Sequence, residues 1–388
     1  MCIFLGEIKE DNMKKTLALL VTFAMSVSVF AGCAGTAVVE KENPNTEVST
    51  EVSTEVAVDT EEVTTTEIVA DTEVDGTAAS TSEPRPVKTG LSVTTALSGT
   101  DATADAEGTA QADITIVAVT VDAEGKINSC VIDQIQGANT FTATGELTTE
   151  KTEFLSKNEL GSDYGMVAWG GAIAEWDAQA AALAEYVVGK TAEEVKGISI
   201  VEGGKAGDTD LSASATMAIA GFIDPIVAAV NNAKDLGAAH WDTLQLVSVT
   251  TPHDNAAATA EKDGTASAYA TVAAVTTHYD EITSCVIDAV QANVTFDATG
   301  KITTDFAAPV LTKNEKGADY GMVAWGGAIA EWNEQAASFA KYATGKTISE
   351  VVGLAVDETG KTTDTDLLSS VTIKIGDFKA LFEKVVNE

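Results

Sequence analysis

Two threonines in this chain end short stretches whose other side chains are mostly small. Thr216 lies six residues after Asp210, and Thr372 lies six residues after Asp366. A threonine hydroxyl is a nucleophile when a base takes its proton. Small neighbours let a second protein close around such a hydroxyl, and the small neighbours here are Ala213, Ser214, Ala215, Ser369 and Ser370. Both threonines are therefore candidate acceptors of a transferred group; the alternative is an ordinary strand threonine after an Asx turn.

The two stretches belong to a long internal repeat. Residues 164–176 recur without change as residues 320–332, at an offset of 156 residues. The same offset maps residues 208–211 onto 364–367 and residues 92–95 onto 248–251. A period of this length indicates duplicated domains rather than a solenoid. We place these tandem homologous domains at residues 89–240 and 241–388.

Residue types needed for conventional catalysis are sparse. The three histidines, His240, His253 and His278, have no histidine at the matching position of the other copy, which argues against a Ser/His/Asp arrangement. The sequence has no Walker loop, metal-ligand cluster or dinucleotide fingerprint. Cys130 and Cys285 each occur once per copy, and we interpret them as buried free thiols rather than a redox pair.

Net charge narrows the class of partner. The chain has 59 Asp and Glu residues against 23 Lys and Arg residues, for a formal charge of −36. Nucleic acids are bound through clustered Lys and Arg, so this composition argues against a nucleic-acid partner.

Each copy predicts the same order of elements. Residues 114–121 and 127–132 are β-rich runs around a turn, and the second copy has a tighter turn because it lacks the turn glycine. Apolar residues spaced by three and four predict a helix from Ile173 to Val187 and another from Ile329 to Ala343. Glycines are expected at the ends of these helices, followed by capping boxes; the residues are Gly189, Gly345, Thr191 with Glu194, and Thr347 with Glu350.

The end of each copy predicts a strand followed by a helix. In residues 371–375, alternation turns Thr372 towards solvent and its apolar neighbours towards the core. The closing helices are expected at residues 222–233 and 378–386, with Asp224 and Pro225 as the cap and first turn of the first one. The predicted fold class is therefore α+β, with an antiparallel sheet and packed helices in each copy.

The amino-terminal region is typical of an export signal and a spacer. A basic start at Met13 precedes an apolar run over residues 16–30 and small residues before Cys33. This order resembles a bacterial lipoprotein signal, with residues 1–32 removed and Cys33 lipidated; an uncleaved signal anchor is the alternative. Residues 34–88 contain thirteen acidic and three basic side chains and no aromatic residue. We therefore predict that residues 33–88 form a disordered tether rich in Thr, Glu and Val.

The stretches ending at Thr216 and Thr372 resemble the sequence read by bacterial flavin transferases of the ApbE type. That pattern is an aspartate, two variable residues, Ser or Thr, small residues that are usually glycine and alanine, and the acceptor threonine. The departures here are Ala213 at the usual hydroxyl position, Ser214 and Ser370 in place of glycine, and Val371 in place of alanine. The order of lipidated cysteine, Thr-rich tether and two related domains also resembles the PplA-type flavin-carrying lipoproteins of Gram-positive extracellular electron transfer.

The resemblance implies a covalent FMN on each domain, attached as a phosphoester by an ApbE-type flavin transferase. Besides the two threonines, it implies cofactor-binding roles for Asp210, Asp366, Ser214 and Ser370. Aromatic candidates for contact with the flavin are Tyr164, Trp169 and Trp176 in the first copy and Tyr320, Trp325 and Trp332 in the second.

The implied protein is a redox carrier rather than an enzyme, and it is itself the substrate of an FMN transferase. It would be lipid-anchored on the extracytoplasmic face of the cell membrane. It would carry electrons from membrane NADH- or quinone-linked donors to extracellular acceptors. The alternative is a cofactor-free solute-binding or adhesive surface lipoprotein.

Overall fold

The computed structural model describes residues 83–386, and the predicted signal peptide, Cys33 and most of the predicted tether lie outside them. These described residues form one compact unit. Within it we call residues 86–239 the first half and residues 243–386 the second half. The first strand begins at Pro86, three residues before the predicted start of the first domain.

Two antiparallel sheets form the centre of this unit. The first sheet has the order β3-β2-β1-β6, and its strands are β1 (Pro86–Thr100), β2 (Gly108–Val121), β3 (Ile127–Phe141) and β6 (Lys234–Ala239). The second has the order β7-β8-β9, with β7 (Thr243–Thr251), β8 (Gly264–His278) and β9 (Glu281–Phe296). A short pair, β4 (Ile200–Val201) and β5 (Lys205–Ala206), completes the strands of the first half.

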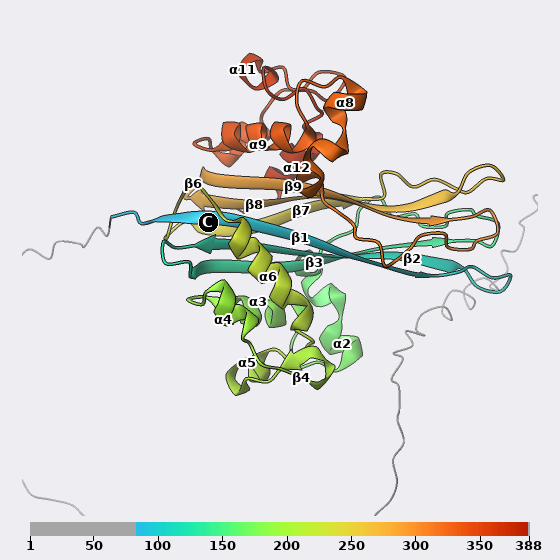
Figure 1. The fold of residues 1–388 in the computed structure, drawn as a ribbon, viewed down its shortest axis with the longest axis horizontal. Helices are drawn as coiled ribbons and strands as arrows, with labels where there is room; N and C mark the ends of the chain where they lie inside the picture. The colour runs from blue at the N-terminus through green and yellow to red at the C-terminus, as the bar shows by residue number, and fades with distance from the viewer. Residues whose placement is uncertain (1–82, 387–388) are drawn as a thin grey trace, which may run out of the picture. The chain divides into compact units, whose positions relative to one another are not determined.

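Helices cover the outer face of each sheet (Figure 1). Those of the first half are α1 (Lys157–Leu160), α2 (Met166–Gly170), α3 (Trp176–Val187), α4 (Ala192–Lys196), α5 (Thr209–Ser214) and α6 (Ala220–Asn232). Those of the second half are α7 (Lys313–Lys316), α8 (Met322–Gly326), α9 (Trp332–Ala343), α10 (Ile348–Val352), α11 (Thr365–Leu368) and α12 (Gly376–Glu383). Short 3₁₀ turns, η2 (Gly161–Tyr164), η3 (Glu202–Gly204) and η4 (Gly317–Tyr320), connect some of them. The predicted class, α+β with antiparallel sheets and packed helices, is confirmed.

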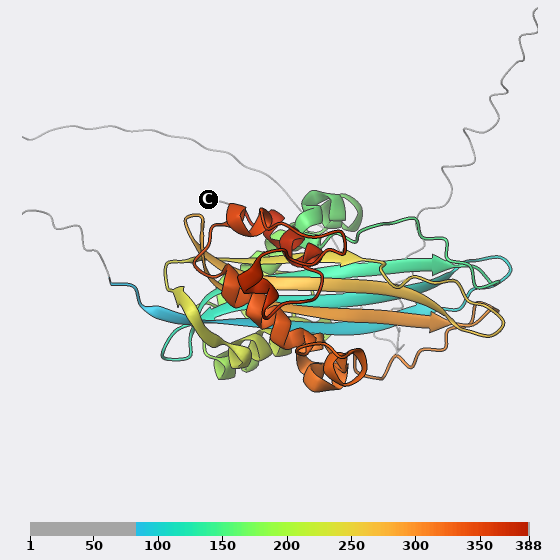
Figure 2. The ribbon, with the colours of Figure 1, turned by 90° about the horizontal axis from the view of Figure 1, so that it is seen from above.

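The two sheets pack against each other, so the strands are buried on both faces. In β2, Ile116 and Ala118 face the second sheet, whereas Val117 and Val119 face the helices of the first half. Alternation along a strand gives each face its own set of side chains. Figure 2 shows that the long strands of both sheets run along the same direction, as in an aligned sandwich.

Contacts between the halves are reciprocal. The N–H of Ala102 donates to the carbonyl of Gly300 at 2.8 Å, and the N–H of Ala258 donates to the carbonyl of Gly145 at 2.8 Å. Phe141 and Phe296 stack at the same seam, with ring centroids 4.1 Å apart. Contacts exchanged in both directions are the pattern that a two-fold axis imposes on a pair of subunits.

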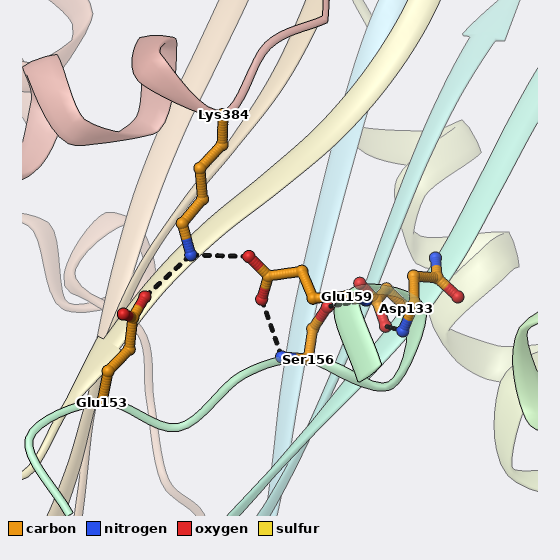
Figure 3. A network of polar contacts seen from close by, with 6 residues as sticks. Asp133, Glu153, Ser156, Glu159 and Lys384 are labelled. Carbon is orange, nitrogen blue, oxygen red and sulfur yellow. Dashed lines mark hydrogen bonds and ion pairs between the residues drawn. The ribbon is translucent and has the colours of Figure 1, made fainter. Parts of the chain in front are cut away.

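A lysine of the second half also binds the first half. The Lys384 ammonium lies 2.8 Å from a carboxylate oxygen of Glu153 and 2.6 Å from one of Glu159 (Figure 3). Glu159 is also part of the capping box with Ser156 that begins α1. One carboxylate therefore stabilises a helix start and the seam between the halves.

Several local predictions are confirmed. The hairpin turns lie at residues 122–126 and 279–280, and the second is the tighter one. Gly189 and Gly345 follow α3 and α9 with φ of 80° and 81°, a backbone conformation that favours glycine. The capping boxes at Thr191 and Thr347 both form.

Three predictions about element bounds are wrong. The long helices begin at Trp176 and Trp332, and Ile173 and Ile329 are exposed residues of the preceding loops. Pro225 lies inside α6 and does not follow its cap, because the helix already begins at Ala220. The third, the strand expected before each closing helix, concerns the candidate site: neither residues 215–219 nor residues 371–375 form a strand.

The repeated residues 92–95 and 248–251 occupy different registers. Ser92 pairs with Val117, which faces the helices of its own half. Ser248 pairs with Val272, which faces the other sheet. A shift of one residue turns a strand's side chains to the opposite face, so this part of the sequence repeat is not a structural repeat.

Candidate functional site

Thr216 lies in an irregular segment between α5 and α6. Asp208 caps α5, because its carboxylate accepts hydrogen bonds from the N–H groups of Asp210 and Leu211. Leu211, Ala215 and Ile219 are buried, and they anchor the segment on the core of the first half. Thr216 itself is half-buried. Thr216 is therefore a partly exposed residue of a segment whose neighbours are fixed.

The second half repeats this arrangement around Thr372. Asp364 caps α11 through the N–H groups of Asp366 and Leu367, and Tyr342 donates a further hydrogen bond of 2.8 Å to this carboxylate. Leu367, Val371 and Ile375 are buried, whereas Thr372 is half-buried. The apolar residues around both threonines are therefore buried at matching positions in the two halves.

A buried glutamine holds each threonine. In the first half, Oε1 of Gln179 accepts hydrogen bonds from the N–H groups of Thr216 and Met217, both at 2.9 Å. The Thr216 hydroxyl donates to the same oxygen at 3.3 Å. Nε2 of Gln179 donates to the Ala174 carbonyl at 2.8 Å. The side-chain amide of Gln179, which is 0% exposed, therefore joins the threonine to the loop before α3.

Gln335 makes the same set of bonds in the second half. Its Oε1 accepts from the N–H of Thr372 at 2.8 Å, from that of Ile373 at 3.2 Å and from the Thr372 hydroxyl at 3.3 Å. Its Nε2 donates to the Ala330 carbonyl at 2.8 Å. The sequence reasoning missed both glutamines. Their only sequence signal is that they recur on the apolar face of the repeated helix.

The predicted strand through Thr372 is wrong, and Gln335 explains why. The N–H groups of Thr372 and Ile373 bind a side chain, so neither is free to pair with a neighbouring strand. Only Lys374 makes an isolated bridge, with Lys361. The prediction that Val371 and Ile375 face the core is nevertheless confirmed. Thr372, predicted to turn towards solvent, is half-buried, and its hydroxyl donates to buried Gln335.

The identical segments at residues 164–176 and 320–332 lie beside these threonines. The Glu175 carboxylate accepts hydrogen bonds from the N–H groups of Met166 at 2.8 Å and Val167 at 3.1 Å, which fixes the start of α2. Glu175 and Gln179 are separated by one helical turn and so lie on the same face of α3. Helix α2, which carries Trp169, and the segment with Thr216 are therefore held by neighbouring side chains of α3 and its cap.

Trp169 and Trp325 are almost fully exposed, at 87% and 90%. A Cβ atom on Gly165 would lie 2.3 Å from the Trp169 ring, so only glycine leaves room for the indole. Gly321 has the same relation to Trp325. Exposed tryptophans in matching positions, with Ile173 and Ile329 also exposed, form an apolar surface in each half.

Tyr164 and Tyr320 lie deeper and contact a buried lysine. The Lys157 ammonium is 4.6 Å from the centroid of the Tyr164 ring and 5.0 Å from that of Trp176. Lys313 has the same position relative to Tyr320 and Trp332, at 4.8 Å from each centroid. Burial lowers the pKa of both lysines to about 8, and nearby carboxylates oppose this effect.

A buried carboxylate accompanies each lysine. Asp133, which Figure 3 also shows, accepts hydrogen bonds from the N–H groups of Gln134 and Asn158. Burial nevertheless raises the pKa of Asp133 to about 6, and it raises that of Asp288 equally. These pairs lie beneath the surface near each site, and nothing in their geometry places them at the threonine hydroxyls.

The other predicted site residues lie on the helices before the threonines. Asp210 and Asp366 are exposed on the first turns of α5 and α11. The hydroxyls of Ser214 and Ser370 donate to the carbonyls of Leu211 and Leu367, both at 3.3 Å. The structure therefore places each aspartate, serine and threonine of the pattern on one short helix and the segment that follows it.

The two candidate sites lie on opposite outer sides of the sandwich. Figure 1 shows α5 and α11 beyond the two sheets, on opposite faces. Packed sheets are about 10 Å apart, and a helix adds roughly another 10 Å on each side. The two hydroxyls are therefore on the order of 30 Å apart, so groups attached to them cannot stack on each other.

Each site offers a half-buried threonine on an ordered segment, with an exposed indole on the short helix α2 or α8. That arrangement fits a bulky group attached from outside, such as FMN. Within residues 83–386 no cluster of His, Cys, Asp and Glu has the geometry of a metal site. None of the helices in this range is long and apolar enough to cross a membrane. Comparisons with family models, characterised proteins and solved structures gave no match.

Proposed function

We propose that this protein is an extracytoplasmic electron carrier with FMN attached covalently to Thr216 and Thr372. The observation that carries the proposal is the matched presentation of the two threonines. Each is half-buried, follows a short capped helix and is bound by a buried glutamine through the same set of hydrogen bonds.

The proposed attachment is a phosphoryl transfer from FAD. The threonine Oγ1 forms a bond to the FMN phosphorus, the pyrophosphate bond breaks, and AMP leaves. The hydroxyl proton passes to a base of an ApbE-type flavin transferase. Gln179 and Gln335 orient the hydroxyls, and the exposed small residues Ala213, Ser214 and Ser369 leave space for the transferase.

Bound FMN would supply the redox chemistry, because it accepts and releases electrons. The chain's own residues would fix the attachment point and present the apolar surface with Trp169 or Trp325 to the ring. Sites on opposite faces let one carrier present a flavin to a membrane donor and another to an extracellular acceptor. The proposed carrier has two tandem homologous domains on a lipidated tether, residues 33–88. The tether would keep the carrier at the membrane and raise its local concentration near the electron donor and the electron acceptor.

Absorbance of denatured and dialysed protein tests this proposal. Protein co-expressed with a flavin transferase should retain the flavin bands after denaturation, because a covalent flavin cannot be dialysed away. Thr216→Ala and Thr372→Ala should each remove half of this absorbance, and the double variant should remove all of it. A colourless wild-type protein under these conditions would contradict the proposal.

The exposed tryptophans favour a second candidate, a cofactor-free binding module. The identical short helices α2 and α8, which present Trp169 and Trp325, could bind two copies of one partner without any flavin. In that case binding would depend on the tryptophans, and Thr216→Ala and Thr372→Ala would leave it unchanged.

A further inference from the structure

A cavity of about 670 Å³ lies beside Thr372, and its wall is formed mostly by the second half, with Lys151 and Thr152 of the first half. This volume is within the range of roughly 300–1,000 Å³ that is typical of small-molecule sites. Ile373 and Lys374, which directly follow the candidate threonine, form part of its wall. The cavity therefore begins within two residues of the proposed attachment point.

Aromatic and cationic side chains meet in this cavity. The aromatic part of the wall is formed by Tyr269, Trp332 and Phe378, and the nitrogen-bearing part by Lys151, His253 and Lys374. Asp377 is the only carboxylate in the wall. The chain has far more acidic than basic residues, so two lysines from distant segments at one aromatic cavity are an unusual local composition.

Packing beneath the cavity holds its aromatic wall in place. The buried Lys313 ammonium donates a 2.8 Å hydrogen bond to the Tyr269 hydroxyl and lies 4.8 Å from the centroid of the Trp332 ring. Phe378 meets Trp332 edge-on, with centroids 5.8 Å apart. His253 tilts over Tyr269, with centroids 5.8 Å apart.

The wall depends on residues that the first half does not have. At the repeat offset, Asp113 corresponds to Tyr269 and Ala218 corresponds to Lys374. Strand β7 also ends at Thr251, because Pro252 has no N–H for the ladder. In the first half β1 continues to Thr100. The chain therefore leaves the sheet early in the second half, which brings His253 to the cavity.

We propose that this cavity binds the isoalloxazine ring of a flavin. The aromatic wall fits a planar ring, and Lys374 and Lys151 favour the negative charge that the ring acquires on reduction. The attachment of this ring to Thr372 rests on the proposed function. The binding of a free ring by the cavity does not rest on it. The ring at Thr372 is then sheltered, and a ring at Thr216 lies against the exposed surface with Trp169. The two flavins of one molecule are therefore not equivalent.

The cavity itself is tested with full-length protein that has never met a flavin transferase. The probe is lumiflavin, the free ring without its phosphate, and the readout is quenching of its fluorescence. Lys374→Ala and Tyr269→Asp, which introduce the first-half residues, should each weaken binding about tenfold, equivalent to about 1.4 kcal/mol. Lys374 is exposed, so its substitution is not expected to unfold the protein. Lys262→Ala, at an exposed lysine outside the cavity wall, is the matched control.

The source of the ring is tested with flavinylated protein. FMN carried only on Thr372, in Thr216→Ala, should fluoresce several-fold less than FMN carried only on Thr216, in Thr372→Ala. Adding Tyr269→Asp to the Thr216→Ala variant should restore the emission of the FMN on Thr372. Adding Trp325→Ala to the same variant should leave that emission unchanged.

The outcomes separate the two proposals. Lumiflavin binding that depends on Lys374, with no FMN on Thr372 by mass, supports the cavity and contradicts the carrier. Covalent FMN whose emission is equal at both threonines and insensitive to Tyr269 supports the carrier and overturns the cavity. Dependence on Trp325 instead of Tyr269 overturns the cavity as well.

Discussion

Replacing Gln335 with leucine tests whether the buried glutamine positions the acceptor threonine. Leucine is of similar size but has no polar atom. The N–H groups of Thr372 and Ile373 and the carbonyl of Ala330 would each lose a hydrogen-bond partner. A buried polar group without a partner costs about 1–3 kcal/mol. Thr372 and Ile373 are half-buried, so water can replace part of the loss, and we expect a decrease of about 3 kcal/mol in the free energy of unfolding.

Urea unfolding measures this decrease, and peptide mass analysis after treatment with a flavin transferase measures the effect on the acceptor. Because Gln335 holds only Thr372, the modified fraction should fall several-fold at Thr372 and stay unchanged at Thr216. Gln179→Leu is the matched control, with the opposite preference. Unchanged stability together with equal modification at both threonines would refute the positioning role.

Three further predictions concern stability and reactivity. Burial raises the folded-state pKa values of Asp133 and Asp288 to about 6, well above the usual range of a carboxyl group, so the folded state binds more protons between about pH 4 and 6. The free energy of unfolding should therefore fall as pH rises through this window, by roughly 3 kcal/mol per group. Thermal melts should show this fall, and the double variant Asp133→Asn with Asp288→Asn should show a smaller one. Lys384→Met should lower the free energy of unfolding by about 1 kcal/mol, because it removes two ion pairs at the seam, and a loss that high salt does not reduce would argue against that origin. Burial raises the pKa of the Cys285 thiol well above its usual range, so Cys285 should react slowly with thiol reagents in the native protein at pH 8, and rapid labelling of Cys285, located by peptide mass analysis, would contradict the packing around β9.

Local sequence signals predicted much of the secondary structure. The hairpins, the helix-ending Gly189 and Gly345, and the capping boxes at Thr191 and Thr347 depend on residues close together in sequence. Such signals act within one or two turns of chain, so a single sequence is enough to read them.

The features that were missed depend on contacts distant in sequence. Thr372 was predicted to lie on a strand because residues 371–375 alternate, but the side chain of Gln335 takes the backbone hydrogen bonds that a strand needs. Ile329 fits the helical spacing yet lies exposed in the loop before α9. The packing of one sheet on the other explains the doubly buried strands, and no periodicity within one strand reveals its partner.

Peptide mass mapping of the mature protein from its native host tests the central claim most directly. The account predicts that the peptides containing Thr216 and Thr372 each carry the added mass of an FMN phosphoester, with fragment ions that place it on the threonine. FMN on Ser214 or Ser370 would correct the acceptor residue. Unmodified peptides at both positions, from protein that has met the host's own transferase, would contradict the account.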